Sequence, residues 1–141
     1  MDREYQDKFL QTTSSAATED VRHPHTVLHL AFDAIIQGNY DAFNELITDD
    51  VELTICGFTA LDGTWRGREE VLAATRRNFA RVGNQKPEIE SMISQGDQVA
   101  VLLRESGVVK SSGQAYSVRG VEWFTFARGK IRKIDEIIAS I

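Results

Sequence analysis

Apolar residues recur along the chain with two different periods. In residues 24–36, 40–47 and 68–82 they lie three or four positions apart, which is typical of helices that bury one side. In residues 51–56 and 87–94 they alternate with polar residues, which is typical of strands that bury one face. The pattern therefore predicts three helices and a sheet that comes mostly from the later residues.

The last third of the chain has the most regular pattern. It predicts three long strands, in residues 99–109, 114–126 and 130–141. The segments between them, Ser111-Ser112-Gly113 and Ala127-Arg128-Gly129, have the composition of tight turns. Because tight turns join only antiparallel neighbours, these strands predict an antiparallel sheet on which the helices pack.

The boundaries of the predicted elements follow from a few polar and glycine residues. Gly38-Asn39 is expected to end the first helix and to cap the second, and Asp49-Asp50 to end the second. Residues 57–67 contain three glycines and predict a loop or ragged hairpin. We expect residues 1–22 to be a polar tail, or an arm laid on a neighbour, and residues 23–141 to form one domain.

Composition excludes several classes of partner. The net charge is -5 and no basic run is present, so we expect neither nucleic acid nor an anionic membrane to be bound. No segment approaches the length of roughly 20 apolar residues that a membrane span needs. Cys56 is the one cysteine, which excludes a disulfide within the chain and favours a cytoplasmic location.

Four motifs in order resemble one protein family. They lie in the runs AFDAIIQGNYDAFNELITDDVELTICG, GTWRGREEV, SQGDQVAVLLRESG and FTFARGKIRKIDE. The helix ending in Gly-Asn, the Asp-Asp-Val strand entry, the Gly-Arg-Glu helix start and the Gly-Lys-Ile hairpin resemble the SnoaL-like and ketosteroid-isomerase-like branch of the nuclear-transport-factor-2-like superfamily. The resemblance covers about residues 25–141.

The resemblance implies an α+β fold, the cystatin-like cone. Three N-terminal helices pack on a strongly curved mixed, mainly antiparallel sheet, and an apolar cavity opens at one end. It also implies a homodimer through the outer sheet face, where strand alternation places Trp123. Members include isomerases, cyclases, hydratases and binding modules without activity, so the fold leaves the function open.

Two of the three groups that the ketosteroid isomerase mechanism needs are missing. The position of the family's carboxylate base is Ile55, and that of its tyrosine is Ala31. Apolar side chains cannot move protons, so steroid isomerisation by the family mechanism is not expected. The third position, that of an acid, falls on Glu122.

Glu122 is the best candidate for a catalytic acid or base. Strand alternation places it on one face with Gly120, Phe124 and Phe126. Inside an apolar cavity its pKa would be raised. The alternatives are a structural ion pair with Arg119 or Arg104, or a position in solvent. Asp135 and Glu136 are weaker candidates, because only one of two neighbouring strand residues faces inward.

The remaining candidates concern binding rather than proton transfer. His29 is a weak candidate at the edge of the pocket, and His25 and His29 lack a third ligand at a spacing that would indicate a metal site. Trp65 is expected either to cover the cavity mouth or to seal a loop against the core. No phosphate-binding glycine loop is present, so no cofactor is expected. The expected lining is Phe32, Ile35, Ile55, Trp65, Leu72, Phe79, Glu122 and Phe124.

Two functions remain open from the sequence. The first is a cofactor-free isomerase, cyclase or hydratase that binds a small, largely hydrophobic molecule and uses a pocket acid. The second is a binding protein or an accessory dimerisation module of the same fold without activity.

Overall fold

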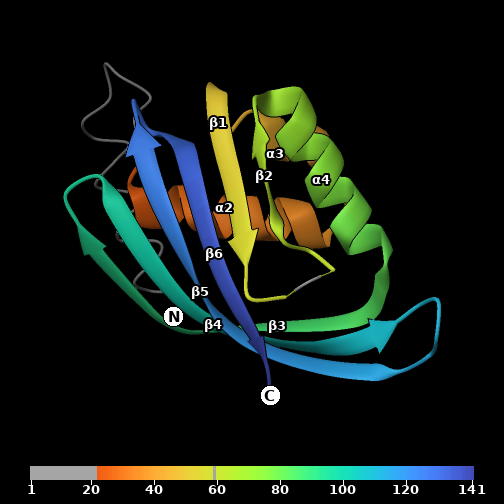
Figure 1. Ribbon diagram of the computed structural model, residues 1–141. Helices are drawn as coiled ribbons and strands as arrows, with labels where there is room; N and C mark the ends of the chain where they lie inside the picture. Colours follow the sequence, from red (N-terminus) through yellow and green to blue (C-terminus); the bar gives the residue numbers. More distant parts are fainter. Residues whose placement is uncertain (1–21, 59) are drawn as a thin grey trace.

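The computed structural model describes residues 22–58 and 60–141 (Figure 1). The predicted N-terminal tail or arm lies outside these residues, apart from Arg22. In the described part, the elements follow one another in the order α2, α3, β1, β2, α4, β3, β4, β5 and β6. This is the predicted order with one addition, the short strand β2.

Three helices precede most of the sheet in this part of the chain: α2 at Pro24–Ile36, α3 at Tyr40–Asn44 and α4 at Arg68–Ala80. Gly38 follows α2 with a positive φ of 71°, a conformation that glycine adopts at low cost. Asn39 caps α3, because its side-chain oxygen accepts a hydrogen bond from the amide of Ala42 at 3.1 Å. The predicted boundary at Gly38-Asn39 is therefore confirmed.

Two other predicted boundaries are wrong. The second helix ends at Asn44 rather than Ile47, because Ile47 already begins strand β1, Ile47–Cys56. Asp49-Asp50 lies inside this strand, where its register against β6 shifts between Ile47 and Glu52. Such an irregularity lets two successive polar residues remain exposed without ending the strand.

One six-stranded sheet contains all the strands of the described part. After β1 come β2 at Gly63–Arg66, β3 at Val82–Gln95, β4 at Gln98–Val109, β5 at Ala115–Ala127 and β6 at Lys130–Ser140. Their spatial order is β2-β1-β6-β5-β4-β3. Neighbours are antiparallel except β1 and β6, which are parallel. The sheet is thus mixed and mainly antiparallel, as predicted.

The sheet curves around the helices (Figure 1). Its register shifts within the β3–β4 and β5–β6 pairs, and irregularities of this kind bend strands. The helices lie on the concave side, which gives the predicted α+β cone of the cystatin-like type. One face of the sheet is therefore inner, toward the helices, and the other is outer.

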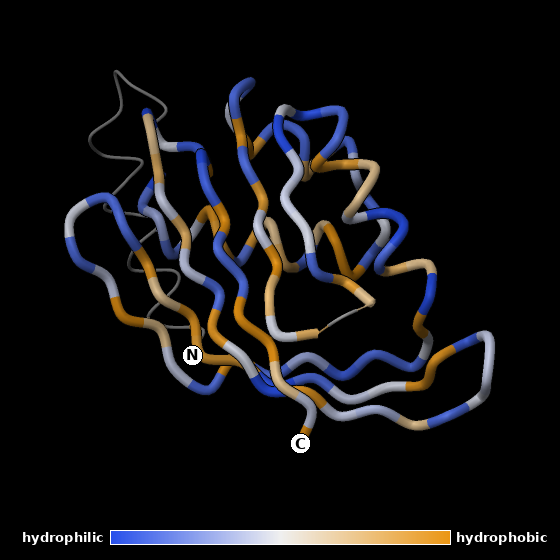
Figure 2. Tube along the Cα trace, viewed as in Figure 1, coloured by the Kyte–Doolittle hydropathy of each residue, from blue (hydrophilic) through white to orange (hydrophobic). Residues whose placement is uncertain are grey.

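Apolar side chains fill the space between the helices and the inner face. Apolar and polar segments follow one another along the strands (Figure 2), and in β1 alternate residues from Val51 to Ile55 are buried in this space. The largest fully buried side chains are Val27, Leu28, Phe43, Ile47, Val51, Val71, Val99, Val101 and Ile131. No helix in the described residues has the length and apolar character to cross a membrane.

Candidate functional site

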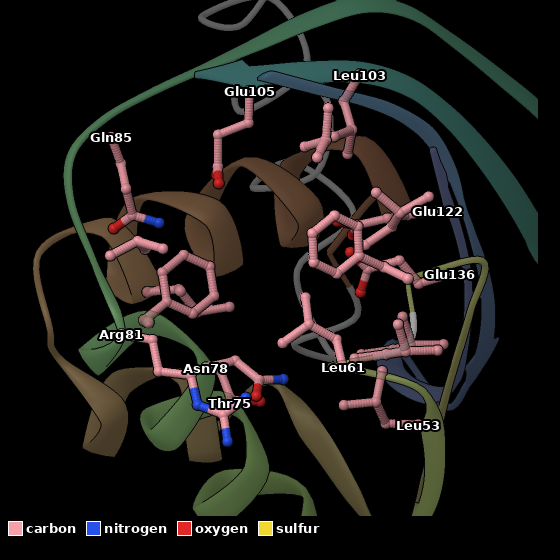
Figure 3. Close-up of a pocket in the computed structure, with 18 of the residues that line it drawn as sticks. Leu53, Leu61, Thr75, Asn78, Arg81, Gln85, Leu103, Glu105, Glu122 and Glu136 are labelled. Carbon is pink, nitrogen blue, oxygen red and sulfur yellow. The ribbon is translucent and has the colours of Figure 1, made fainter. Parts of the chain in front are cut away.

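A cavity of about 320 Å³ lies between the helices and the inner face of the sheet (Figure 3). Helices α2 and α4 line one side, and strands β1, β4, β5 and β6 line the other. Most of the lining is apolar or aromatic, and a few polar side chains converge on it. This combination is typical of sites for small molecules.

Glu122 and Glu136 lie next to each other in this cavity. They are directly paired residues of β5 and β6, and therefore point to the same face of the sheet. In the neighbouring strands, Val101 of β4 pairs with Glu122 and Ile55 of β1 pairs with Glu136, and both of these residues are buried. The Cβ atoms of such cross-strand pairs are about 5 Å apart. Figure 3 shows the two carboxyls side by side at one wall.

Neither carboxyl has a hydrogen bond or an ion pair with another described residue. Protein encloses both side chains, and the partial surface that they expose belongs to the cavity. Arg104 and Arg119 instead bind Glu90 on the outer face, at 2.6 and 2.8 Å. The alternative of an ion pair between Glu122 and one of these arginines therefore does not describe the structure.

Burial changes the protonation of this pair. It raises the pKa of Glu122 well above its usual range, and the charges of Glu136 and Glu105 raise it further. Burial, followed by the charge of Glu105, raises the pKa of Glu136 to about 7. At neutral pH the pair therefore retains a proton, and Glu122 is the residue that holds it more tightly.

Glu105 has a donor of its own. The Tyr116 hydroxyl donates a hydrogen bond to its Oε2 atom at 2.7 Å. Burial raises the pKa of Tyr116, and the bond to Glu105 raises it further, so this hydroxyl stays protonated. Gly107 leaves room for the tyrosine ring, because a Cβ atom there would lie 2.8 Å from it. The cavity thus contains a neutral donor and an acceptor in addition to the Glu122–Glu136 pair.

Six of the predicted site residues line the cavity, on four different elements: Phe32, Ile35, Ile55, Phe79, Glu122 and Phe124. The rings of Phe32 and Phe124 meet edge to face, with centroids 6.1 Å apart. Helix and sheet therefore touch through aromatic side chains at the wall. Their role in binding a ligand stays a prediction.

Trp65 and Leu72 do not line the cavity, in contrast to the sequence-based expectation. Trp65 pairs with Leu53 in the β1–β2 hairpin, and its ring lies against Gly63. The guanidinium of Arg77 in α4 covers the ring at 5.5 Å from its centroid. Both side chains pack against the hydrophobic core. For Trp65 this is the second of the two expected positions, in which it seals a loop against the core.

His29 also lies outside the lining. It is half-buried on α2, and its Nε2 atom has no hydrogen-bond partner in the described part of the chain. Burial lowers its pKa, although the charge of Asp33 acts in the opposite direction. Among residues 22–58 and 60–141, no three His, Cys, Asp or Glu side chains are placed to hold a metal ion.

Several polar lining residues were not predicted from the sequence. Glu105, Tyr116, Asn78 and Gln85 belong to this group. Alternation within β5 relates Tyr116 to Glu122, since they are six residues apart, but only strand pairing brings Glu105 beside them. Glu136 was only a weaker candidate from the sequence, but the structure places it in the lining directly beside Glu122.

Comparisons with known proteins give the family and the fold. The model of the SnoaL-like domain family matches residues 28–134. A comparison with curated proteins found no match. Solved structures with the same fold include an NTF2-like protein from Burkholderia thailandensis, with 22% identity and a TM-score of 0.73 over 83% of this chain and 91% of that chain. A candidate SnoaL-like polyketide cyclase from Jannaschia sp. has 21% identity and a TM-score of 0.73, over 83% and 89%.

A third similar structure is an NTF2-like protein from Burkholderia xenovorans. It has 23% identity and a TM-score of 0.68, over 79% of this chain and 86% of that chain. At these identities the three structures establish the shared architecture. A shared architecture does not determine the chemistry, which depends on the residues of the cavity.

Proposed function

The chain belongs to the SnoaL-like domain family, and we propose that it binds a small, largely apolar molecule in the cavity and transfers a proton on it with Glu122 and Glu136. The pair of facing carboxyls in an apolar cavity is the observation that supports this function. One carboxyl that holds a proton beside one that is close to ionising supplies an acid and a base at neutral pH.

The reaction class is a cofactor-free isomerisation, cyclisation or hydration. In an isomerisation, ionised Glu136 takes a proton from the carbon next to a carbonyl. Glu122 donates its proton to the carbonyl oxygen in the same step, which gives an enol. The pair begins and ends this step with one proton, so no further co-reactant is needed.

Ile55 and Ala31 restrict where in the cavity a proton can be transferred. Both residues are buried and line the cavity, at the positions where ketosteroid isomerases carry their base and tyrosine. Proton transfer from those positions is excluded by their side chains. The proposed pair therefore keeps the acid position of the ketosteroid isomerase pattern in Glu122 and differs from that pattern in its base, Glu136.

A screen of small ketones and enones, followed by substitution, tests the proposal. Glu122→Gln keeps the shape of the side chain but removes the acid, and should lower kcat by roughly 100-fold or more. Glu90→Gln is the matched control, because Glu90 lies on the outer face of the same sheet. A substrate that is turned over equally well by Glu122→Gln would contradict this role.

A binding protein without activity is the second candidate function. The loss of both polar groups at Ile55 and Ala31 favours it. Under this alternative, Glu122→Gln changes the affinity for a ligand, and no member of the screen is turned over.

The outer face of the sheet is the surface that we propose for a homodimer. Ile93, Trp123 and Ile137 are 70%, 45% and 59% exposed there, on three different strands. Ala100 of β4 pairs with Ile93 of β3 on one side and with Trp123 of β5 on the other. A second copy that covers this apolar surface would remove it from water. We also retain the cytoplasm as the proposed location, on the evidence of the single cysteine.

A further inference from the structure

The charges around the cavity do not balance within the described residues. Glu105, Glu122 and Glu136 supply three carboxyls to the lining, whereas Arg81 supplies one guanidinium. Arg81 is exposed and donates a hydrogen bond to the backbone carbonyl of Ala60 at 3.1 Å. Figure 3 shows its side chain across the cavity from Glu122 and Glu136. One wall is therefore acidic, and no cation from residues 22–58 or 60–141 lies beside it.

The carboxyls on this wall differ in their need for a partner. Glu105 already accepts a hydrogen bond from the Tyr116 hydroxyl. Glu122 and Glu136 have no donor among the described residues, and their accessible surface faces the cavity. Buried polar groups are rarely left without a partner, because this costs free energy. A group on the bound molecule is the partner that these two carboxyls can meet.

The other walls indicate what the rest of the molecule is like. Phe32 and Phe124 form an aromatic corner, and Phe58 and Phe79 also line the cavity. Aromatic faces attract cations as well as apolar groups, and do so more strongly where water is excluded. A cationic head beside carboxyls, attached to an apolar body between rings, satisfies all of these walls.

We propose that the ligand of this cavity carries a positively charged nitrogen on an apolar body, with the nitrogen beside Glu122 and Glu136. This inference rests on the proposed function, because it takes the cavity as the binding site. An organic anion of the same shape would be repelled by the acidic wall. An uncharged analogue would gain hydrogen bonds without the attraction between opposite charges, and should bind with intermediate affinity.

The proposal also predicts how the affinity for a cation depends on pH. In the described part of the chain, the titratable or charged groups that line the cavity with the pair are Glu105 from β4, Tyr116 from β5 and Arg81 after α4, whereas α2 and β1 contribute apolar residues. A bound cation favours the ionised form of Glu136, the carboxyl that is closer to ionising, while Glu122 keeps its proton. Because the pKa of Glu136 is raised to about 7, binding at pH 6 must displace a proton that is mostly absent at pH 8. The affinity for a cation should therefore rise by up to about tenfold between these pH values.

Three probes that share a benzyl group test this inference: benzylamine, which is a cation, benzyl alcohol, which is neutral, and phenylacetate, which is an anion. Each is titrated into the full chain at pH 7.5, and binding is followed by NMR at the side chains of the lining. We expect benzylamine to bind about tenfold more tightly than benzyl alcohol, and phenylacetate to bind most weakly. The preference for benzylamine should also decrease at pH 6.

Two variants test whether the preference for benzylamine over benzyl alcohol depends on Glu122 and Glu136. The double variant Glu122→Gln with Glu136→Gln should bind benzylamine and benzyl alcohol equally, whereas Glu90→Gln should keep the wild-type preference. Thermal unfolding of both variants checks that the fold is intact. A single variant, Glu136→Gln, provides the same comparison if the double variant fails to fold.

The outcomes separate the two proposals. Equal binding of benzylamine and benzyl alcohol to the wild-type cavity overturns the charge preference and leaves cavity binding in place. Tightest binding of phenylacetate also overturns it. If no probe perturbs the lining residues at up to about 20 mM, a concentration that detects even very weak ligands, both the charge preference and the proposed binding function are contradicted.

Discussion

Glu90 and Glu122 are the same amino acid on opposite faces of one sheet. On the outer face, Glu90 accepts hydrogen bonds from Arg119 and Arg104, which lower its pKa. On the inner face, Glu122 faces another carboxyl in an apolar cavity, and its pKa is raised. The comparison teaches that position on the sheet, rather than residue type, determines which glutamate can carry a proton at neutral pH.

The two faces also reverse the usual distribution of residues. The inner face presents two enclosed acids, and the outer face presents exposed Trp123, Ile93 and Ile137. Each departure costs stability in an isolated chain. Stabilisation of both faces by something bound, a ligand inside and a second copy outside, is what the proposals above have in common.

The largest expected effect is a loss of stability as the pH rises. Glu122 and Glu136 have raised pKa values in the folded chain, so the folded state binds more protons than the unfolded state above about pH 4.5. The free energy of unfolding should therefore fall as the pH rises from about 4.5 through about 7. For Glu136 alone the loss is on the order of 3 kcal/mol. Urea unfolding at pH 5, 6, 7 and 8 measures it.

Glu90 sharpens this test because its pKa shift has the opposite sign. Its stabilising effect is present above the pKa of the unfolded chain and is lost only at more acidic pH, so Glu90 adds no slope between pH 5 and 8. Burial lowers the pKa values of His23, His25 and His29, and these residues add a slope of the opposite sign in the same window. The double variant Glu122→Gln with Glu136→Gln keeps the contribution of the histidines and should lose the fall in stability that the inner pair causes. A pH profile that is the same for the wild-type chain and the double variant would refute the placement of these acids.

A charge on the outer face should disrupt the proposed dimer. Trp123→Glu places a carboxylate at the centre of the apolar surface, and should raise the dissociation constant by about 30-fold or more. Sedimentation over a range of concentrations measures it. Ile36→Glu is the control, since Ile36 is 50% exposed but lies on α2. A wild-type chain that sediments as a monomer at every concentration shows that the outer face has another role.

Removal of the Tyr116 hydroxyl should have a moderate effect. Tyr116→Phe leaves Glu105 without its donor, and should lower the free energy of unfolding by about 1–2 kcal/mol. Urea unfolding at pH 7 measures the change. If stability is unchanged, water replaces the hydroxyl and this part of the cavity is open to solvent.

The smallest effect is expected at Glu90. Its two ion pairs are exposed, where water and salt screen the attraction. Glu90→Gln should therefore leave the unfolding midpoint unchanged within error. A clear destabilisation would mean that the outer face is covered in solution.

The fold was predictable because its signals are local. Helical and alternating periods, the glycines of the turns and the caps at Gly38-Asn39 each depend on neighbouring residues. The error at Asp49-Asp50 has a long-range cause. These two acids would normally interrupt a strand, but Ile47 before them and Glu52 after them both pair with β6, which no local pattern reveals.

Only half of the acidic pair was predictable. Strand alternation gives the inward direction of Glu122. Counting along the β5–β6 hairpin from its first pair, Ala127 with Lys130, would place Asp135 opposite Glu122. The register shifts by one residue between Thr125 and Phe126, and Glu136 takes that place. A one-residue shift reverses the face of every residue beyond it, and the sequence gives no clear signal for it.

The pairing of β1 with β6 has a consequence for how this protein is made. β6 lies in the interior of the sheet, between β1 and β5, although it is the last of the described strands in the chain. During synthesis, α2, α3 and β1 leave the ribosome long before the strand that joins them to the rest of the sheet. We expect the early segments to wait, incompletely folded, until residues 130–140 emerge. A chain cut short before them would expose two sheet edges to other nascent chains.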